Sequence, residues 1–227
     1  LVVEGNDRDM YRFEGIGILA QGAQHGADII NCSWGGQVRS RVGEDVVHYV
    51  HEMYQTGIIA ACGNTPADLA FYPASFPEVI SVSNVHQGDS ICCPTFLSST
   101  FNYAVDVAAP GWELTTAVGT NRYGPFSGTS ASSPVVAGAA GIVMAHFPDY
   151  TGFQAGQRLR VTTDDIYQNP YNEPFLEKLG TGRVNLEKAL NDPRKPSIRL
   201  DAYSFSPDLE RAGFQRNDTL RIFPDFI

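Results

Sequence analysis

A run of small, hydroxyl-bearing residues in the second half of the chain has the composition of a nucleophile motif. It reads Gly128-Thr129-Ser130-Ala131-Ser132-Ser133-Pro134. The Ala- and Val-rich stretch that follows predicts a helix over 134–146, with Ser132 and Ser133 as candidate caps and Pro134 in its first turn. A serine just ahead of a helix faces unpaired backbone N–H groups and the positive end of the helix dipole, which favour negative charge. Ser130 is therefore a candidate nucleophile; the alternative is that these serines simply cap a helix.

A second polar residue stands where a buried strand is predicted to end. The strand covers 58–61, and Gly63-Asn64 follows it. In an open parallel sheet, the carboxyl ends of the strands line the ligand crevice. An Asn side chain at that edge can donate its amide N–H to a developing oxyanion. An ordinary Asn turn is the alternative interpretation.

The elements that must position these residues alternate along the chain. Apolar, β-branched strands are predicted over 27–32, 58–61, 79–82 and 105–108. Helices are predicted over 41–54, 134–146, 153–160 and 186–190, and an earlier helix is indicated by helical spacing of Ile16, Leu19, Ala20 and Ala23. Apolar strands separated by helices indicate an α/β protein, with a parallel sheet covered by helices on both faces.

The bulk composition limits the classes of partner. The chain has 227 residues, 43% hydrophobic and 18% charged, with a formal net charge of −9. An acidic chain is a poor ligand for nucleic acid or an anionic membrane. No apolar run reaches the roughly 18–20 residues of a membrane-spanning helix. We therefore predict no nucleic-acid partner and no membrane partner.

The composition changes near Asn191, where the proline-rich, charged segment 192–196 is typical of a linker. We predict a single domain over 1–192, and over 193–227 a linker with the start of a downstream β-rich domain. The four cysteines are Cys32, Cys62, Cys92 and Cys93, and they form no Cys-x-x-Cys pair. Buried free thiols are the expected state, and the cysteines do not settle the compartment.

Several blocks of the chain, taken together, resemble the subtilase (subtilisin-like serine protease) family and occur in the family's order over roughly 1–191. They are Asp28-Ile29-Ile30-Asn31-Cys32-Ser33-Trp34-Gly35-Gly36, Ala60-Ala61-Cys62-Gly63-Asn64, Tyr72-Pro73-Ala74-Ser75-Phe76-Pro77, Asp106-Val107-Ala108-Ala109-Pro110-Gly111, the run from Gly128 to Pro134, and Leu179-Gly180-Thr181-Gly182-Arg183-Val184-Asn185. In the nucleophile block, Ala131 stands where a Met is common. The resemblance implies a subtilisin-like α/β fold that is incomplete at its N-terminus.

The resemblance also implies roles for single residues. Ser130 would be the nucleophile of a serine endopeptidase, and Asn64 and the backbone N–H of Ser130 would hold the oxyanion. The substrate-binding residues would be Ser33, Trp34, Gly35, Ala61, Cys62, Gly63, Phe71 and Thr129. A bulky Phe71 where the family has the floor of a specificity pocket should favour small substrate side chains. Protein or peptide substrates and a secreted or periplasmic location are implied in the same way.

One departure from the family is large. Its triad runs Asp, His, Ser along the chain, but this sequence contains neither the family's Asp motif nor its His motif. Of the five histidines only His25 is followed by Gly, and in register with the family Leu1 already lies beyond the catalytic histidine. We expect the natural N-terminus to lie upstream and the missing N-terminal part of the same domain to be the chain's partner. The chain alone is expected to be inactive.

The main alternative function is a non-catalytic subtilase-like binding or structural domain. Retention of both Ser130 and Asn64 argues against it, and the sequence upstream of Leu1 would decide. An α/β-hydrolase esterase needs Gly-x-Ser-x-Gly, and Ser132 replaces its second Gly.

Other ligand motifs are incomplete. His48 and His51 match no zinc protease signature, and the glycine-rich segment 15–20 lacks the strand that a dinucleotide site requires. No cofactor is needed for the chemistry. A structural Ca²⁺ is allowed by the resemblance near the carbonyls of Ala74, Phe76 and Val79, but no side-chain cluster demands one.

Overall fold

A parallel four-stranded sheet forms the centre of the protein. The computed structural model describes residues 10–91 and 99–197. The sheet has the order β1-β2-β3-β4, made of β1 (Ile29–Cys32), β2 (Gly57–Ala61), β3 (Val79–Val85) and β4 (Val107–Pro110). In the register, Ile30 lies opposite Ile58, and Ile59 lies opposite Ile80. The predicted parallel α/β architecture is confirmed, with the last strand starting two residues later than the 105–108 prediction.

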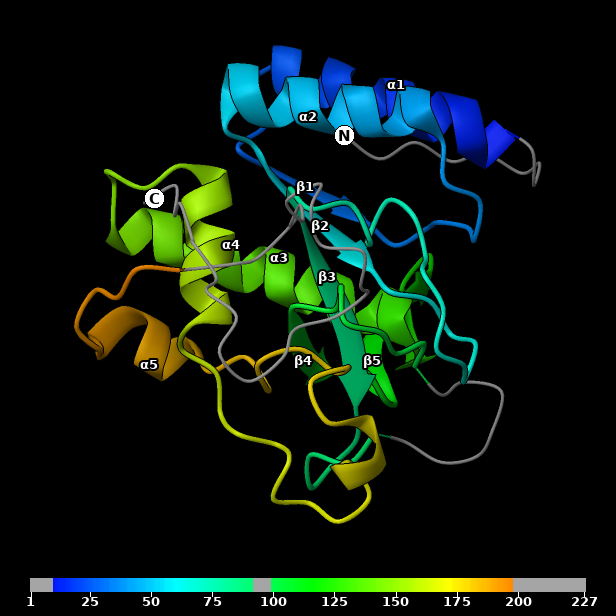
Figure 1. Ribbon diagram of the computed structural model, residues 1–227, viewed down its shortest axis with the longest axis vertical. Coiled ribbons are helices and arrows are strands. Elements are labelled where there is room, and N and C mark those ends of the chain that lie inside the picture. Colours follow the sequence, from blue (N-terminus) through cyan, green and yellow to red (C-terminus); the bar gives the residue numbers. More distant parts are fainter. Residues whose placement is uncertain (1–9, 92–98, 198–227) are drawn as a thin grey trace, which may run out of the picture.

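Helices lie on the two sides of the sheet (Figure 1), and alternate residues of the strands pack against them. Ile58 and Ala60 face a cluster that includes α1 (Met10–Gln24) and α2 (Arg41–Tyr54). Ile59 faces the opposite cluster, built with α3 (Thr129–His146), α4 (Gly152–Arg160) and α5 (Leu186–Asn191). Every residue of β2 and β3 is buried, as expected for strands covered on both faces.

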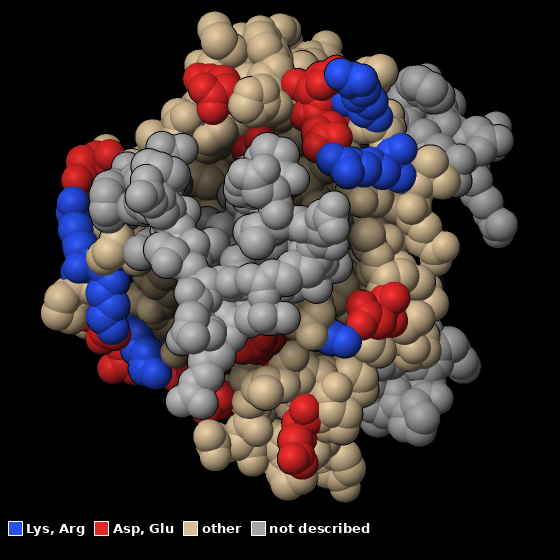
Figure 2. Space-filling view, viewed as in Figure 1, with Lys and Arg blue, Asp and Glu red and all other residues tan. Residues whose placement is uncertain are grey.

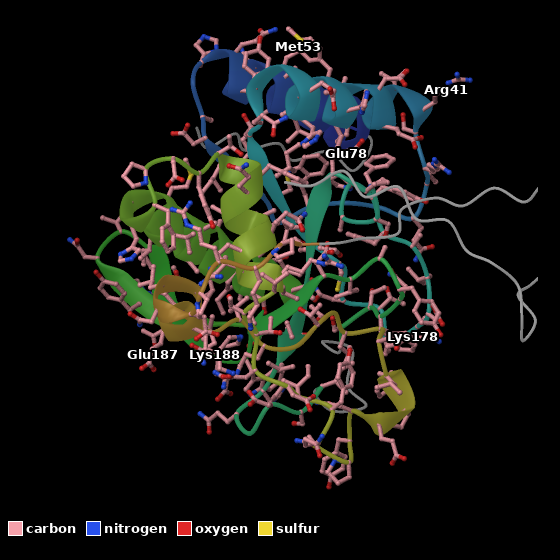
Figure 3. The ribbon with its side chains drawn as sticks, turned by 60° about the vertical axis from the view of Figure 1, so that its left-hand side comes forward. Arg41, Met53, Glu78, Lys178, Glu187 and Lys188 are labelled. Carbon is pink, nitrogen blue, oxygen red and sulfur yellow. The ribbon has the colours of Figure 1, made fainter. Side chains whose placement is uncertain are left out.

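The helices on either side begin where the sequence provides caps. The Ser40 side chain accepts a hydrogen bond from the N–H of Gly43 at the start of α2, and Thr151 and Gln154 form a capping box at the start of α4. Figure 3 shows Arg41 and Met53 toward opposite ends of α2, with Glu78 beneath the helix. The Glu78 carboxylate lies 3.0 Å from His48 Nδ1, so the His48 side chain is an exposed partner of a carboxylate.

The start of α3 differs from the sequence prediction. The helix begins at Thr129, so Ser132 and Ser133 lie buried inside it, and they are not its caps. Pro134 therefore sits in the interior and removes the N–H that would bond to the carbonyl of Ser130. That carbonyl accepts instead from the hydroxyl of Ser33, at 2.9 Å. A side chain from the end of β1 thus replaces the helical hydrogen bond that the proline removes.

An antiparallel hairpin between the sheet and α3 was not predicted. It consists of β5 (Leu114–Gly119) and β6 (Arg122–Phe126), and its tip includes Asn121 with a φ of 54°. A 3₁₀ turn (Glu173–Phe175) lies further along the chain. The hairpin joins the end of β4 to the Gly128–Ser130 turn, and the N–H of Gly128 donates to the carbonyl of Gly111 at 2.7 Å.

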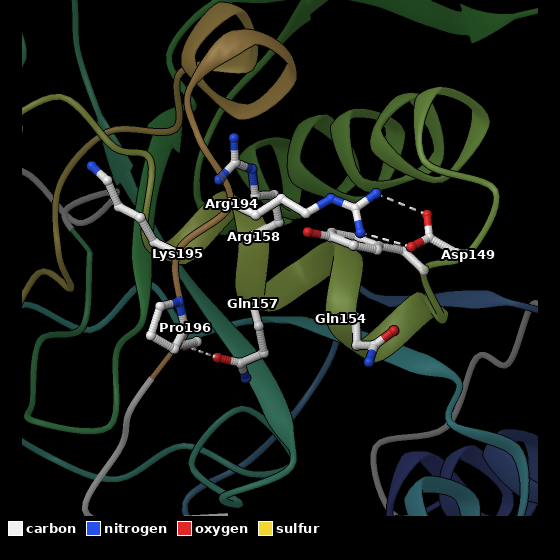
Figure 4. Close-up of a pocket in the computed structure, with 9 residues that line it drawn as sticks. Asp149, Gln154, Gln157, Arg158, Arg194, Lys195 and Pro196 are labelled. Atoms are coloured by element: carbon white, nitrogen blue, oxygen red, sulfur yellow. Dashed lines mark hydrogen bonds and ion pairs between the residues drawn. The ribbon is translucent and has the colours of Figure 1, made fainter. Parts of the chain in front are cut away.

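Residues 193–197 are held on α4 by hydrogen bonds. Arg158 donates to the carbonyl of Pro193 at 2.9 Å, and Ser197 donates to Gln157 at 2.6 Å. A pocket of about 320 Å³ lies between this segment and α4, beside the Arg194–Asp149 ion pair (Figure 4). The predicted downstream domain falls almost entirely on 198–227, outside the described residues, so the boundary near residue 192 stays a prediction.

The visible surface carries mixed charge. Figure 2 shows Lys and Arg beside Asp and Glu around the rim of one face. Within the described ranges, none of the helices is both long enough and apolar enough to cross a membrane.

A buried ion pair ties β4 to α4 and gives a stability prediction. Asp106 is 3% exposed; its carboxylate accepts from the N–H of Ser81 at 2.9 Å and lies 3.2 Å from Arg160 Nε. Asp106→Ala should lower the free energy of unfolding by about 3–5 kcal/mol, because it leaves the Arg160 side chain, which is only 15% exposed, without this carboxylate. Urea unfolding followed by circular dichroism measures the change.

The exposed ion pair of Asp149 with Arg194 provides the matched control. Asp149→Ala should cost about 1 kcal/mol or less, because water screens exposed pairs. Equal losses in the two variants would show that the Asp106 pair contributes no more than a surface contact.

Candidate active site

Ser130 lies in the first turn of α3, where backbone N–H groups have no helical acceptor. The N-cap residue is Gly128. Its φ of 105° is a backbone conformation that residues with a side chain rarely adopt. The Ser130 hydroxyl is half-buried and donates to the carbonyl of Ser33 at 3.2 Å. The serine is thus held at a helix N-terminus, directly beside the segment that follows β1.

Asn64 follows β2 and contacts the residue before Ser130. Its Oδ1 accepts hydrogen bonds from the backbone N–H of Thr129 at 2.8 Å and from the Thr129 hydroxyl at 3.0 Å. A Cβ on Gly128 would lie 2.9 Å from the same Oδ1, so the glycine lets the side chain approach. Because Oδ1 is occupied by two donors, the orientation of the amide is fixed and Nδ2 is left as the group available to donate elsewhere.

A chain of side-chain hydrogen bonds joins β1 to α3 below the serine. Ser133 donates to Asn31 Oδ1 at 2.7 Å, and Asn31 Nδ2 donates to the Ser33 hydroxyl at 3.0 Å. The Ser33 hydroxyl donates in turn to the carbonyl of Ser130. Sequence reasoning missed Asn31 and Ser133 as positioning residues. Their polar side chains, in an otherwise apolar strand and inside an apolar helix, were the available signal.

The structure brings several other predicted residues to the same edge of the sheet. Ala61 and Cys62 are buried, so their side chains offer no outer surface. The Cys62 thiol lies 3.1 Å from the carbonyl of Thr100, and burial raises its pKa to about 12. Cys32 is likewise buried and free, and burial raises its pKa to about 12 as well. Both thiols are therefore protonated and unreactive at neutral pH.

Of the predicted substrate-binding residues near the end of β1, Trp34 packs toward α1. A Cβ on Gly15 would lie 3.0 Å from the Trp34 ring. Thr129 is buried, and its hydroxyl donates a hydrogen bond to Asn64. Gly35 and Gly63 both lie against the ring of Phe71. Cys92 and Cys93 lie outside the described residues.

None of the histidines, all of which are described, provides a base for Ser130. Their partners lie elsewhere: Gln21 for His25, Glu78 for His48, Glu52 and Phe153 for His51, Trp112 for His86, and Phe147 for His146. The pKa of His86 is lowered, mainly because burial disfavours its charged form. The hydroxyl of Ser130 therefore lacks a neighbouring imidazole in the described part of the chain.

Metal ligands do not gather in the described residues, which contain no group of three or more His, Cys, Asp or Glu able to hold an ion. The carbonyl of Phe76 accepts from the N–H of Val79 in a turn. The calcium site near these carbonyls stays a prediction.

The fold and the arrangement of this edge define a subtilisin-like α/β domain. The model of the subtilase family matches residues 1–188, and the chain therefore belongs to that family. It is 35% identical over 146 residues to the thermophilic serine proteinase of Bacillus sp. (strain AK1), covering 63% of this chain and 34% of that protein. It is 34% identical over 172 residues to thermitase of Thermoactinomyces vulgaris, covering 76% of this chain and 57% of thermitase.

Solved structures share the fold. Fervidolysin from Fervidobacterium pennivorans, a keratinolytic enzyme related to subtilisin, superposes with a TM-score of 0.64 at 26% identity, over 78% of this chain and 28% of that one. The prenylagaramide maturation protease PagA superposes with a TM-score of 0.70 at 20% identity, over 84% of this chain and 69% of that one. At this identity the likeness shows the fold alone. The match covers 34% of the AK1 proteinase and 57% of thermitase, so this chain spans well under two thirds of their length.

Proposed function

We propose that this chain is the nucleophile-bearing part of a subtilisin-like serine endopeptidase. The observation that carries the proposal is the junction of Ser130 and Asn64. A serine in the first turn of a helix stands next to an amide whose orientation is fixed by Thr129. Family membership supports the reaction class.

The proposed chemistry is acyl transfer. The Ser130 oxygen attacks the peptide carbonyl carbon while its proton passes to a base, and the oxyanion is held by Asn64 Nδ2 and the Ser130 N–H. The C–N bond then breaks, the proton is returned to the leaving amine, and water hydrolyses the acyl-enzyme. Serine needs such a base because the neutral hydroxyl is a weak nucleophile.

The base is proposed to come from a segment that packs beside α3 and β1. On the outer side of α3, Val135 is 38% exposed and Ile142 is 48% exposed, and Gly138 between them is exposed as well. Within the described ranges β1 is hydrogen-bonded on one side only, to β2. An apolar helix face beside an open strand edge is what a further strand and helix of the same domain would cover.

The proposed substrates are proteins or peptides, and the proposed location is outside the cytoplasm. The relative from Natrialba magadii, which is 34% identical over 174 residues, is named a halolysin-like extracellular serine protease.

Labelling of the full natural polypeptide with a fluorophosphonate tests the proposal. This reagent phosphonylates an activated serine, so we expect labelling at Ser130 that Ser130→Ala abolishes, with peptide mapping as the readout. Ser132→Ala is the matched control: its hydroxyl is buried and donates to the carbonyl of Ala109 at 3.0 Å, so the labelling should persist.

Failure of the folded full polypeptide to react would refute the proposal. It would favour the alternative, a non-catalytic subtilase-like binding domain.

A further inference from the structure

The pocket between α4 and residues 193–197, called the linker pocket below, is lined by more positive than negative side chains. Arg158, Arg194 and Lys195 line it, and Asp149 is the only carboxylate among its described lining residues. Asp149 already pairs with the guanidinium of Arg194 through both oxygens, at 2.7 and 3.0 Å. The chain as a whole has a formal net charge of −9, so this pocket is a local positive region on an acidic protein.

Arg158 is a buried cation whose hydrogen-bond partners are all uncharged. It is 3% exposed, and it donates to the main-chain carbonyls of Lys188, Ala189, Asp192 and Pro193 at distances from 2.6 to 3.3 Å. Carbonyl dipoles solvate a cation but carry no net charge, whereas buried charges in proteins are usually paired. Across residues 10–91 and 99–197 no carboxylate pairs with Arg158, so an anion in the pocket would supply the missing opposite charge.

Two glutamine amides of α4 add hydrogen-bond donors to the same pocket (Figure 4). The Oε1 of Gln154 accepts from the N–H of Thr151 at 3.0 Å, and the Oε1 of Gln157 accepts from the Ser197 hydroxyl at 2.6 Å. These bonds fix the orientation of both amides, and no described residue accepts from either Nε2. Gln157 is only 6% exposed, so its free donor belongs to a side chain that is otherwise buried. A carboxylate is the acceptor that such donors beside a cation favour.

We propose that the linker pocket binds a carboxylate group, carried either by a small organic acid or by the free C-terminus of a peptide. The Nε2 groups of Gln154 and Gln157 donate to its oxygens, and Arg158 and Lys195 supply the positive charge. The pocket volume of about 320 Å³ is larger than a carboxylate group needs and falls in the size range of small-molecule sites. The proposal goes beyond the proposed function and does not depend on it, because neither Ser130 nor Asn64 lines this pocket.

Isothermal titration calorimetry with two acetylated tri-alanine peptides tests the proposal, one ending in a free carboxylate and the other in an amide. The protein is the full natural polypeptide carrying Ser130→Ala, so that the peptides are not consumed. We expect the free-acid peptide to bind about tenfold more tightly or better, since hydrogen bonds to a charged acceptor are the stronger ones.

Sodium acetate is the second probe and distinguishes the two sources of the carboxylate. Acetate that competes with the free-acid peptide shows that the pocket accepts a peptide C-terminus through its carboxylate. Binding of acetate without binding of the free-acid peptide supports the proposal and assigns the pocket to small organic acids.

Variants of the pocket locate the binding. Gln157→Glu keeps an oxygen for the Ser197 hydroxyl but replaces the N–H donor with a negative charge, so affinity for the free-acid peptide should fall about tenfold or more. Lys195→Ala removes an exposed charge and should weaken binding about two- to fivefold. Lys178→Ala is the matched control, because Lys178 pairs with Asp68 and does not line the pocket.

Three results would overturn the proposal. The first is equal affinity for the free-acid and amide peptides, and the second is no binding of either acetate or the free-acid peptide. The third is an unchanged affinity in a Gln157→Glu variant with the thermal midpoint of the parent, because the carboxylate would then bind elsewhere. None of these results bears on the chemistry proposed for Ser130.

Discussion

Purified alone, the 227-residue chain should hydrolyse peptides roughly 10⁶-fold more slowly than the full natural polypeptide. The size of this loss is the one measured when the triad histidine is removed from subtilisin, a member of the same family. The reason lies in the site: the hydroxyl of Ser130 bonds to the carbonyl of Ser33, and none of the histidines lies beside it. Initial rates on a fluorogenic peptide measure the difference.

Adding the upstream part of the polypeptide in trans provides the positive control. If that part supplies the base, co-refolding the two pieces should restore hydrolysis, and Ser130→Ala in this chain should abolish it again. Rapid hydrolysis by the isolated chain that Ser130→Ala removes would show instead that a base lies within these residues.

Replacing Asn64 with Ala should reduce kcat by about 10²–10³-fold, with little change in KM. This range again comes from the corresponding substitution in subtilisin. The expected effect falls on kcat because the oxyanion forms after the substrate binds, so the amide N–H contributes mainly in the transition state. Steady-state kinetics of the full polypeptide provide the measurement.

Asn64→Asp separates the chemical role of the side chain from its structural role. A carboxylate keeps an oxygen to accept from the N–H and hydroxyl of Thr129, but it cannot donate to an oxyanion. We expect kcat to fall about as far as in Asn64→Ala, while the thermal midpoint stays nearer to that of the wild type. An Asp variant with wild-type kcat would show that the Asn64 N–H is not an oxyanion donor.

The elements with complete local signals could be predicted from the sequence. Helix α2 was predicted with its observed bounds because an amphipathic stripe with Val47 and Val50 is followed directly by Gly57. The four strands were recognised because β2 is apolar over its whole length and the other strands carry short apolar, β-branched runs. The expected alternation with helices holds only between β1 and β2, since no described helix lies between β2, β3 and β4. These signals lie within a few residues of the elements that they define.

The start of α3 could not be predicted because it depends on a hydrogen bond from a residue that is distant in the sequence. Pro134 read alone indicates a first-turn position, but the helix continues through it since Ser33 satisfies the carbonyl of Ser130 from 97 positions away. The site shows the same division. Motifs indicated Ser130 and Asn64 as candidates, and this stays a prediction, whereas the hydrogen bonds through Asn31 and Ser133 depend on how β1 meets α3.

The hydrogen bond from Ser33 to the carbonyl of Ser130 also bears on the order of events during folding. The body of α3 can form from local hydrogen bonds, but its first turn lacks one of them and needs the loop after β1 to dock. The turn that carries Ser130 is thus completed late, after contacts distant in sequence have closed. A nascent chain would therefore acquire an ordered first turn at Ser130 only when the surrounding sheet is already assembled.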